Sequence, residues 1–445
     1  MRVLIFHGYM LRGTGSNIYN ANLARALAGL GHEVHLLCQD RQVKIPGVEI
    51  HNPEIGGLLP VYVKDPYEGF EVKAFPELSD AELDRYLEAN VAAVRAVAAA
   101  AGGIDAALAN HLVMGPAILA RAGVAPYAVK IHGSALEYTV KPHPERFLPY
   151  AREGLGPARG VLVGSAHTGE SLWAALRLAG LEEKTRLGPP GVDVEQFRPR
   201  GEREALVAFV GKLIVSKGVD LLLAAWPLVH AAHPGARLEI AGFGEYEDGL
   251  RRLLAALEAG DLEEARALAR LGRALEGGEE RPLSILSRFL GSPPAGYGEA
   301  ARAAAGSVRL IGRLEHDEVA RFFPRAEAAV MPSTFPEAFG MVAVEAAACG
   351  ALPVSAGHSG MLEVSRQLAP ALPPAVASLT SFEVGEGAVE AIAARLDGWL
   401  SLPAPEREAA RRALVEAVGR LWSWEGVARG VLSAAAGEIG SLPRP

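Results

Sequence analysis

Short apolar runs alternate with longer segments of helical periodicity along most of this chain of 445 residues, and this alternation limits the fold more than any other feature. A short run that is apolar throughout is typical of a strand buried on both faces, and helices between such strands indicate a parallel sheet. The runs form two series, which a stretch rich in proline, glycine and charge separates at 186–204. We therefore predict an α/β protein with two Rossmann-like domains, each built on a doubly wound parallel sheet. The first series comprises 3–6, 33–37, 105–109, 127–131 and 160–164, and the second comprises 206–211, 237–242, 308–312, 327–332 and 352–356.

The domain boundaries follow from the same pattern. We expect an N-terminal domain at 1–187, a linker at 188–204 and a C-terminal domain at 205–422. Within the second domain, the segment at about 245–306 is longer than a strand-to-strand connection and strongly helical. We expect an inserted helical hairpin or cap there, with a plain packing appendage as the alternative. Residues 420–440 have the pattern of an amphipathic helix.

Composition excludes several classes of protein. The formal charge is −8 and the isoelectric point about 5.9, which does not favour nucleic acid or anionic lipid as a partner. The two cysteines, Cys38 and Cys349, cannot form a disulfide framework and are interpreted as small buried thiols. No run of about 18 apolar residues occurs, so we expect no membrane span, although peripheral membrane contact is compatible with the sequence. The N-terminus enters a predicted strand without a signal peptide's pattern, so we expect a cytoplasmic protein.

Ligands of such sheets bind at the carboxyl ends of the strands, and with two domains we expect a binding cleft between them. Lys212 and Lys217 flank the loop after the first strand of the second domain, following Gly211. Two ammonium groups there suit a diphosphate, and two solvated loop lysines are the alternative. Gly13 and Gly15 lie in the first turn of the N-terminal domain, where a helix start favours an anion. A purely structural turn is the alternative.

A second helix start is predicted near Phe339, after the strand that ends at 332. Gly340 permits close approach of a ligand, and the amides of Met341 and Val342 are donors for an anion. Glu345 lies further into this helix and can reach a ribose diol, whereas a glutamate that compensates the helix dipole is the alternative.

Glu337 precedes the same helix, eight residues before Glu345. Eight helical steps span roughly 12 Å, too far for both carboxylates to act on one bond, so we expect them to bind different parts of one ligand. His132 ends a predicted strand of the first domain and faces the same cleft, with a structural hydrogen-bonded histidine as the alternative. No H-E-x-x-H motif, cysteine cluster or G-x-S-x-G motif occurs, so neither a metal site nor a nucleophile elbow is expected.

Together these stretches resemble the retaining glycosyltransferases of family 4, which have the GT-B fold of two Rossmann-like domains facing a central cleft. The resemblance covers nearly the whole chain in the right order, from TGSNIYNANLARALAGLGHEV through GPPGVDVEQFRP and VGKLIVSKGVDLLLAAW to PEAFGMVAVEAAACGALPVSAGHSGMLEV and WSWEGVA. It implies that the helix at 423–445 crosses back and completes the N-terminal domain, which would be the acceptor side.

The resemblance also implies roles for single residues. Glu345 would bind the ribose of a nucleotide sugar, Glu337 the sugar hydroxyls and Lys217 the diphosphate. Lys212 stands where the family usually has arginine, and Thr14 replaces the first glycine of the N-terminal pair, so that Gly15 approaches the phosphates. His132 would contact the donor sugar near the reaction centre. The base would be cradled by Gly312, Arg313 and Leu314, and further donor contacts are expected from Gly13, Gly211, Phe339, Gly340, Met341 and Val342.

The reaction that the resemblance implies is transfer of a sugar with retention at the anomeric carbon, without a metal, a cofactor or an agreed enzyme nucleophile. The leaving phosphate itself would help to deprotonate the acceptor, and Lys212 and Lys217 would stabilise its charge. A UDP-sugar is favoured over GDP-mannose as the donor. The acceptor would be a carbohydrate, a lipid-linked molecule or another small molecule, and the oligomeric state is left open. The alternatives are a nucleotide-sugar epimerase of the same fold and a non-catalytic nucleotide- or carbohydrate-binding protein.

Overall fold

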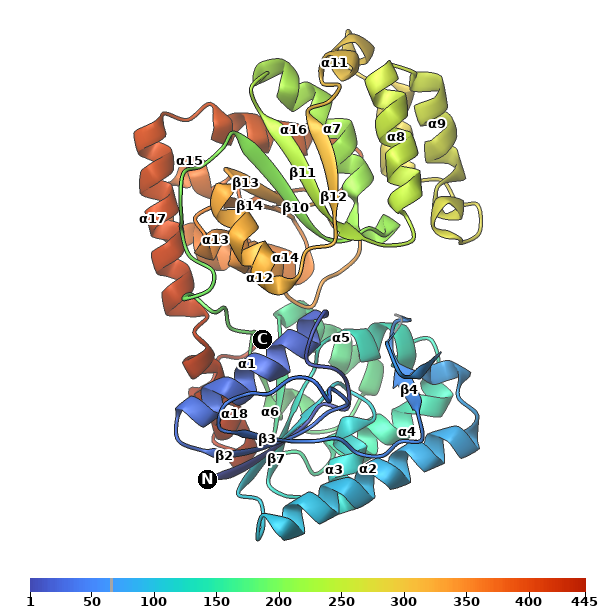
Figure 1. The fold of residues 1–445 in the computed structure, drawn as a ribbon, viewed down its shortest axis with the longest axis vertical. Coiled ribbons are helices and arrows are strands. Elements are labelled where there is room, and N and C mark those ends of the chain that lie inside the picture. Colours follow the sequence, from blue (N-terminus) through green and yellow to red (C-terminus); the bar gives the residue numbers. More distant parts are fainter. Residues whose placement is uncertain (65–66) are drawn as a thin grey trace. The chain divides into compact units, whose positions relative to one another are not determined.

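The chain folds into two compact units, each built around its own parallel sheet. The computed structural model describes residues 1–64 and 67–445. One unit comprises Met1–Gly191 together with Trp422–Pro445, and the other comprises Val192–Leu421 (Figure 1). The corresponding boundaries predicted from the sequence lie at 187, at 205 and at 422–423.

The sheet of the first unit consists of parallel strands, and the residues of its central strands are buried almost throughout. Such strands need cover on both faces, as the continuous apolar runs predicted. Among the described residues the sheet has seven strands, in the order β3 (Val48–His51), β2 (Glu33–Leu37), β1 (Arg2–Phe6), β6 (Ala106–Asn110), β7 (Tyr127–Lys130), β8 (Gly160–Val163) and β9 (Thr185–Leu187). A separate parallel pair is formed by β4 (Leu58–Val61) and β5 (Glu71–Ala74).

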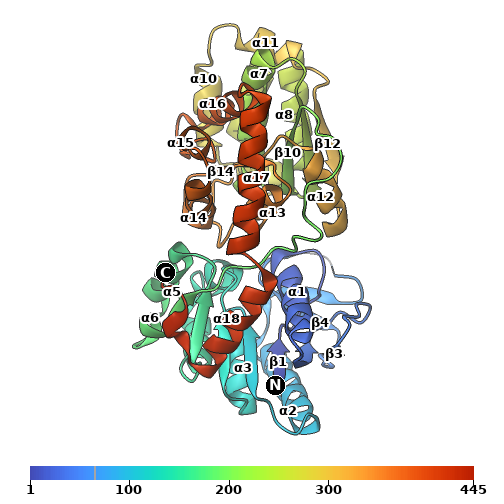
Figure 2. The same ribbon diagram turned by 90° about the vertical axis from the view of Figure 1, so that its left-hand side faces the viewer.

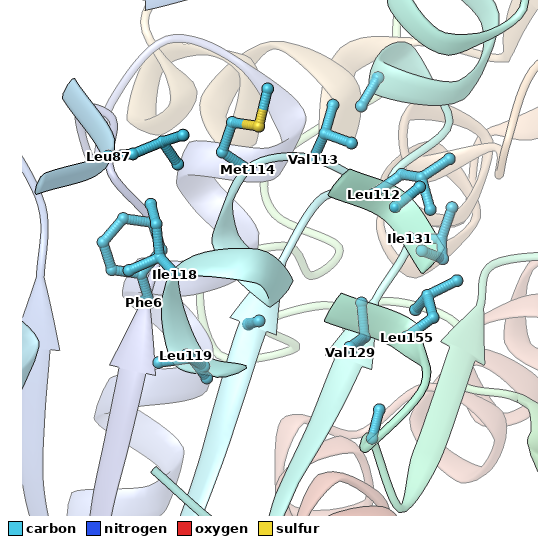
Figure 3. Packing of buried hydrophobic residues seen from close by; sticks show 14 of the residues in the cluster. Phe6, Leu87, Leu112, Val113, Met114, Ile118, Leu119, Val129, Ile131 and Leu155 are labelled. Carbon is cyan, nitrogen blue, oxygen red and sulfur yellow. The ribbon is translucent and has the colours of Figure 1, made fainter. Parts of the chain in front are cut away.

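Successive side chains of a strand point to opposite faces, and β1 shows how this builds two cores. Val3 and Ile5 join the buried side chains of α1 and α18, whereas Leu4 and Phe6 join those of α2, α3 and α4. Figure 3 shows part of the second core, with Phe6 beside Ile118 of α3. Complete burial of such an aliphatic or aromatic side chain stabilises the fold by about 1.5–3 kcal/mol. The helices of this unit are α1 (Gly15–Gly29), α2 (Asp80–Ala100), α3 (Gly115–Ala122), α4 (Pro144–Leu155), α5 (Ala166–Leu176), α6 (Leu181–Lys184) and α18 (Trp424–Ala436).

The helix α18 packs closely on this sheet although the rest of the unit lies more than 200 residues earlier in the sequence. Gly160 of β8 permits the approach, because a Cβ there would lie 2.8 Å from the carbonyl oxygen of Ala434. The single helix predicted at 420–440 is in fact broken. The preceding helix ends at Leu421, and the Ser423 Oγ accepts a hydrogen bond of 3.2 Å from the amide of Gly426, which starts α18 anew.

The sheet of the second unit is also parallel, with six strands in the order β12 (Val308–Gly312), β11 (Arg237–Phe243), β10 (Leu206–Lys212), β13 (Ala328–Met331), β14 (Leu352–Ala356) and β15 (Ser381–Phe382). Its helix α7 packs against α16, and α13 packs against α17 and α14 (Figure 2). Their bounds are α7 (Val219–Ala232), α12 (His316–Phe322), α13 (Met341–Ala348), α14 (Ser359–Leu368), α15 (Pro374–Ala377), α16 (Ala388–Leu400) and α17 (Ala404–Leu421).

The segment expected to be a helical hairpin or cap connects β11 to β12. The structure describes it in full, and it holds four α-helices that pack on one another and on α7. They are α8 (Glu247–Ala259), α9 (Leu262–Leu271), α10 (Ser284–Gly291) and α11 (Tyr297–Ala303). The observed fold has two domains, each with a parallel sheet and helices on both faces, as the alternating apolar runs predicted. Within the described part of the chain, no helix is both long and apolar enough to cross a membrane.

Candidate active site

The predicted site residues of the second unit gather on two loops that leave the carboxyl ends of neighbouring strands. The first loop follows β10, which ends at Lys212, and contains a 3-10 turn at Val215–Lys217 before α7 begins. The amide of Leu213 donates to the carbonyl of Phe243 over 2.8 Å, which ties the loop to the end of β11. The second loop, 332–340, connects β13 to α13.

These two loops are joined through Ser216. Its carbonyl oxygen accepts a hydrogen bond of 2.8 Å from the Thr334 amide and lies 3.0 Å from the Ser333 Oγ. Gly218 makes the approach possible, because it has a φ of +66° and any Cβ there would overlap the carbonyl oxygen of Pro332. The two loops therefore form one continuous surface at this edge of the sheet.

Lys217 and Glu337 meet on this surface as an ion pair. The two side chains are 29% and 21% exposed, so the pair is accessible to a ligand but partly shielded from water. Lys212 is the last residue of β10, directly before the loop that carries Lys217, and is partly buried. The structure thus brings together two of the four residues that were predicted as catalytic, and places the third at the strand end from which one of the two loops leaves.

A ring of hydrogen bonds holds Glu337 in place. Its amide donates to the Ser359 Oγ at 2.9 Å, which lies 3.0 Å from His358 Nδ1. His358 Nε2 lies 2.9 Å from the carbonyl of Ser333, and the Ser333 Oγ donates to Glu337 Oε1 at 2.9 Å, which closes the ring. Because a carbonyl only accepts, His358 carries its proton on Nε2, and Ser359 donates to Nδ1. None of these three supporting residues was predicted to be part of the site.

The helix α13 starts next to this ring. Gly340 is its N-cap residue and no side chain caps the helix, so the amides of Met341 and Val342 in the first turn have no intrahelical carbonyl to bind. Phe339, predicted as the start, lies before the helix. The dipole of α13 and these amides favour an anion here.

Glu345 lies inside α13 and is only 7% exposed. Its Oε1 accepts a hydrogen bond of 3.0 Å from Nε2 of His316, the first residue of α12. Burial lowers the pKa of His316, but the hydrogen bond and the charge of Glu345 outweigh this effect and raise the pKa above its ordinary value. The ring of Phe197 packs on the imidazole with 4.9 Å between centroids. Nothing in the sequence distinguished His316, since a lone histidine before a helix carries no motif.

The residues predicted to surround the base lie at the end of β12, where Gly312 is the last residue of the strand. Gly312 has a φ of +79°, so the backbone turns sharply before Arg313 and Leu314. The guanidinium of Arg313 lies 4.9 Å from the ring centre of Phe243 and 2.9 Å from a carboxylate oxygen of Glu315. Gly211 lies one residue before the end of β10, in register with Gly242 of β11.

The remaining predicted residues belong to the first unit. His132 follows β7, and its Nε2 donates to Asn110 Oδ1 at 2.9 Å. The rings of Tyr19 and His111 flank it, with 5.1 Å and 4.8 Å between centroids. Burial, followed by the charges of His111 and Lys130, lowers the pKa of His132 well below its ordinary value. The imidazole is therefore neutral at physiological pH and presents Nδ1 as a hydrogen-bond acceptor.

Gly13 and Gly15 flank Thr14, the N-cap residue of α1. Gly13 has a φ of +93°, and the Thr14 side chain makes no capping bond to the helix. The helix starts at Gly15. This start is therefore a second helix N-terminus without a side-chain cap, as expected for a turn that approaches an anion.

Comparison with known proteins agrees with this geometry. The family model described as Glycosyltransferase Family 4 matches residues 13–196, and the one described as Glycosyl transferases group 1 matches residues 193–262 and 300–415. Together they cover most of the chain, and the chain belongs to this family of glycosyltransferases. The family predicted from the sequence motifs is confirmed, and so is the predicted GT-B type of fold.

Individual relatives show the same class. The chain is 32% identical over 268 residues to a D-inositol 3-phosphate glycosyltransferase of Segniliparus rotundus, covering 56% of this chain and 46% of the relative. It is 28% identical over 262 residues to a GDP-mannose-dependent monoacylated alpha-(1-6)-phosphatidylinositol monomannoside mannosyltransferase of Corynebacterium glutamicum, covering 53% and 52%. The matches thus span about half the length of these curated relatives. A solved sucrose-phosphate synthase from Thermosynechococcus elongatus has the same fold, with a TM-score of 0.63 at 19% identity over 96% of both chains.

Proposed function

We propose that this protein is a retaining glycosyltransferase that moves a sugar from a nucleoside-diphosphate sugar to an acceptor hydroxyl. The observation that carries the proposal is the pair of Lys217 and Glu337, which lies on two loops joined at the carboxyl ends of β10 and β13. A sugar diphosphate needs a cation for its phosphates and a carboxylate for its hydroxyls, and this pair offers both side by side.

Binding of the donor would exchange partners within the pair. Without a ligand the ammonium of Lys217 is neutralised by Glu337. A diphosphate brings its own negative charge to Lys217, with Lys212 at the end of β10 and the amides of Met341 and Val342 as further partners. Glu337 is then available for sugar hydroxyls, while its ring of hydrogen bonds keeps its carboxylate in place.

Glu345 would bind the nucleoside through a carboxylate held in place by a hydrogen bond, as Glu337 would bind the sugar. Its Oε1 is occupied by His316, which fixes the orientation of the carboxylate inside the first turns of α13. A carboxylate oriented in this manner is suited to a ribose diol. We propose His316 as a positioning residue, because it acts on the ligand through Glu345.

The chemical step would consist of breaking the bond between the anomeric carbon and the phosphate oxygen. The electron pair goes to that oxygen, and Lys212, Lys217 and the N-terminus of α13 stabilise the charge that develops there. The leaving phosphate takes the proton of the acceptor hydroxyl, and the acceptor oxygen bonds to the anomeric carbon on the face that the phosphate leaves, so the anomeric configuration is retained. The neutral His132 of the first unit would hydrogen-bond the sugar without adding charge. A reaction without metal is part of this proposal.

The donor and the acceptor are proposed from the relatives. Resemblance favours a UDP-sugar, whereas the name of the Corynebacterium glutamicum relative specifies GDP-mannose, so both belong in the test. The names of both relatives refer to inositol compounds, which makes D-inositol 3-phosphate the first acceptor to examine.

The test is an assay of nucleoside-diphosphate release from UDP-glucose, UDP-N-acetylglucosamine and GDP-mannose, with and without D-inositol 3-phosphate and simple sugars. We expect release that depends on the acceptor, and a product whose anomeric configuration by NMR equals that of the donor. An isomerised donor sugar without acceptor would instead show an epimerase. A nucleotide that binds without any turnover would show a non-catalytic protein.

A further inference from the structure

Two histidines and a glutamate meet on the edge of the first unit's sheet, in a region that the proposed transfer does not use. His35 lies on β2, and Glu49 and His51 lie on β3, the outermost strand on that side. The register pairs His35 with Glu49, and His51 follows two residues later. Because side chains two apart on a strand share a face, all three project to the same side of the sheet.

The ligand atoms of these side chains are already spaced as a metal ion requires. His35 Nδ1 lies 3.2 Å from His51 Nε2 and 3.4 Å from Glu49 Oε2. The distance between His51 Nε2 and Glu49 Oε1 is 3.8 Å. Ligands at about 2.0–2.1 Å from a tetrahedral Zn²⁺ are separated by about 3.3 Å, which is close to the spacing of the two nitrogens and of Nδ1 from Oε2. The contact with His51 uses the other oxygen, Oε1, so the exposed carboxylate of Glu49 would turn to present a single oxygen to the ion.

A second carboxylate, that of Glu33, contacts the ring nitrogen of His35 that does not face the other two side chains. His35 is only 4% exposed, and its Nε2 lies 3.1 Å from Glu33 Oε1. A carboxylate only accepts, so His35 carries its proton on Nε2 and directs the lone pair of Nδ1 at the other two side chains. A carboxylate that fixes the tautomer of a ligating histidine is a recurrent support of zinc sites.

We propose that His35, Glu49 and His51 bind a divalent transition metal, with zinc as the ion that the donor set fits best. Two imidazole nitrogens and one carboxylate oxygen are typical zinc ligands, and a water molecule would complete the tetrahedron. His51 needs only to move its proton from Nε2 to Nδ1 for its lone pair to face the ion. Glu49 is 67% exposed at its side chain, which leaves an open path for entry.

The ion would have a structural role. Its ligands come from the edge strand β3 and its neighbour β2, so it would connect these two strands and stabilise this edge of the sheet. None of the residues proposed for donor binding or for the transfer belongs to these two strands.

The test measures zinc binding to tag-free, full-length protein that has been stripped with a chelator. Competition with a chromophoric chelator should give one ion per chain, and zinc should raise the melting temperature by mass action. Co²⁺ in place of zinc should give the intense visible absorption of a tetrahedral site. We expect the binding of one ion per chain, the rise in melting temperature and the Co²⁺ absorption to be lost in His51→Ala and in Glu49→Gln.

Two further variants make the outcome specific. Glu33→Gln should keep one ion per chain but weaken its affinity about 10- to 100-fold, because it removes only the support of His35. His143→Ala removes an exposed histidine elsewhere in the same unit and should change nothing. Failure of the stripped protein to bind one ion per chain, or an affinity that His51→Ala and Glu49→Gln leave unchanged, would overturn the proposal.

Discussion

Glu337 and Glu345 show at the scale of single residues what sequence reasoning can and cannot reach. Both were predicted as ligand-binding carboxylates from their positions around a helix start, and so was the cation Lys217. Their hydrogen-bond partners were not predicted. His316 lies 29 residues before Glu345, and Ser359 lies 22 residues after Glu337. Contacts over such separations depend on the tertiary fold, and no local pattern marks them.

Replacing Lys217 by alanine should separate function from stability. The pair with Glu337 is partly exposed, so its loss should cost about 1 kcal/mol or less in the free energy of unfolding. Turnover should fall about 10²–10³-fold, because a charge that stabilises the leaving diphosphate is removed. Steady-state kinetics and thermal unfolding measure the two effects.

A matched control is Arg251→Ala, which removes the cation of a surface pair with Glu247 in α8. It should leave turnover unchanged. A comparable loss of turnover in both variants, or a loss in Lys217→Ala that follows its stability, would contradict the role of Lys217.

The contact between His316 and Glu345 predicts a dependence of stability on pH. The folded-state pKa of His316 is raised, so the contact stabilises the fold fully below the ordinary histidine pKa of about 6.5 and loses this effect as the pH rises through the raised value. His316→Gln should therefore cost about 1.5–3 kcal/mol at pH 5.5 and clearly less at pH 8.5. Urea unfolding of both proteins at the two pH values measures the difference. A cost that is the same at both would exclude a charged His316.

At the scale of elements, the buried strands were predictable and the short polar ones were not. Runs such as 3–6 and 206–211 are apolar throughout, and they became β1 and β10. The strand β3 has the sequence VEIH and no buried residue, so it lacks the continuous apolar run from which the other strands were predicted. The break between α17 and α18 was also missed, because Ser423 lies between two tryptophans that continue the apolar pattern.

The junction of the two site loops depends on Gly218. Alanine there must adopt a positive φ and overlap the carbonyl of Pro332, so Gly218→Ala should lower the free energy of unfolding by about 1–3 kcal/mol and weaken donor binding. Gly419→Ala is the matched control, because this glycine of α17 has open space around its Cβ position. It should stabilise the protein by about 0.4–1 kcal/mol. Chemical denaturation measures both, and equal effects would contradict the proposed close approach.

The helical insertion supplies a support for the loop that holds the lysines. Glu276, in the turn after α9, accepts a hydrogen bond of 2.8 Å from the Val215 amide. Residues 263–299, which include Glu276, lie between the two stretches that match the group 1 family model. The insertion therefore contributes to the site, and its role could not be predicted because the contact spans 61 residues.

Removing this support should disturb the site without touching the ligand. We expect Glu276→Ala to lower kcat/KM for the donor about 10-fold, equivalent to about 1.4 kcal/mol, because the 3-10 turn loses its anchor. Glu276→Gln keeps an acceptor oxygen and should restore most of the activity. Glu279→Ala, an exposed neighbour, should have no effect. The role would be refuted if the glutamine and alanine variants were equally impaired.

At the scale of the whole molecule, the order of motifs along the chain was enough to predict two parallel-sheet domains and the family. This succeeds because the strands, the glycine turns and the helix starts are local features that occur in a fixed order. The identity of the sugar, the base and the acceptor depends on side chains and backbone from distant segments. The edge cluster of His35, Glu49 and His51 was missed for the same reason, since its spacing along the chain fits no metal-binding motif.

A structure of the protein with bound UDP-sugar or GDP-mannose tests the central proposal most directly. We predict a diphosphate within hydrogen-bond distance of the Lys217 ammonium and of the amides at the start of α13, with the Glu337 carboxylate bound to sugar hydroxyls in place of Lys217. A nucleotide sugar bound elsewhere, with the Lys217–Glu337 pair still intact, would contradict it.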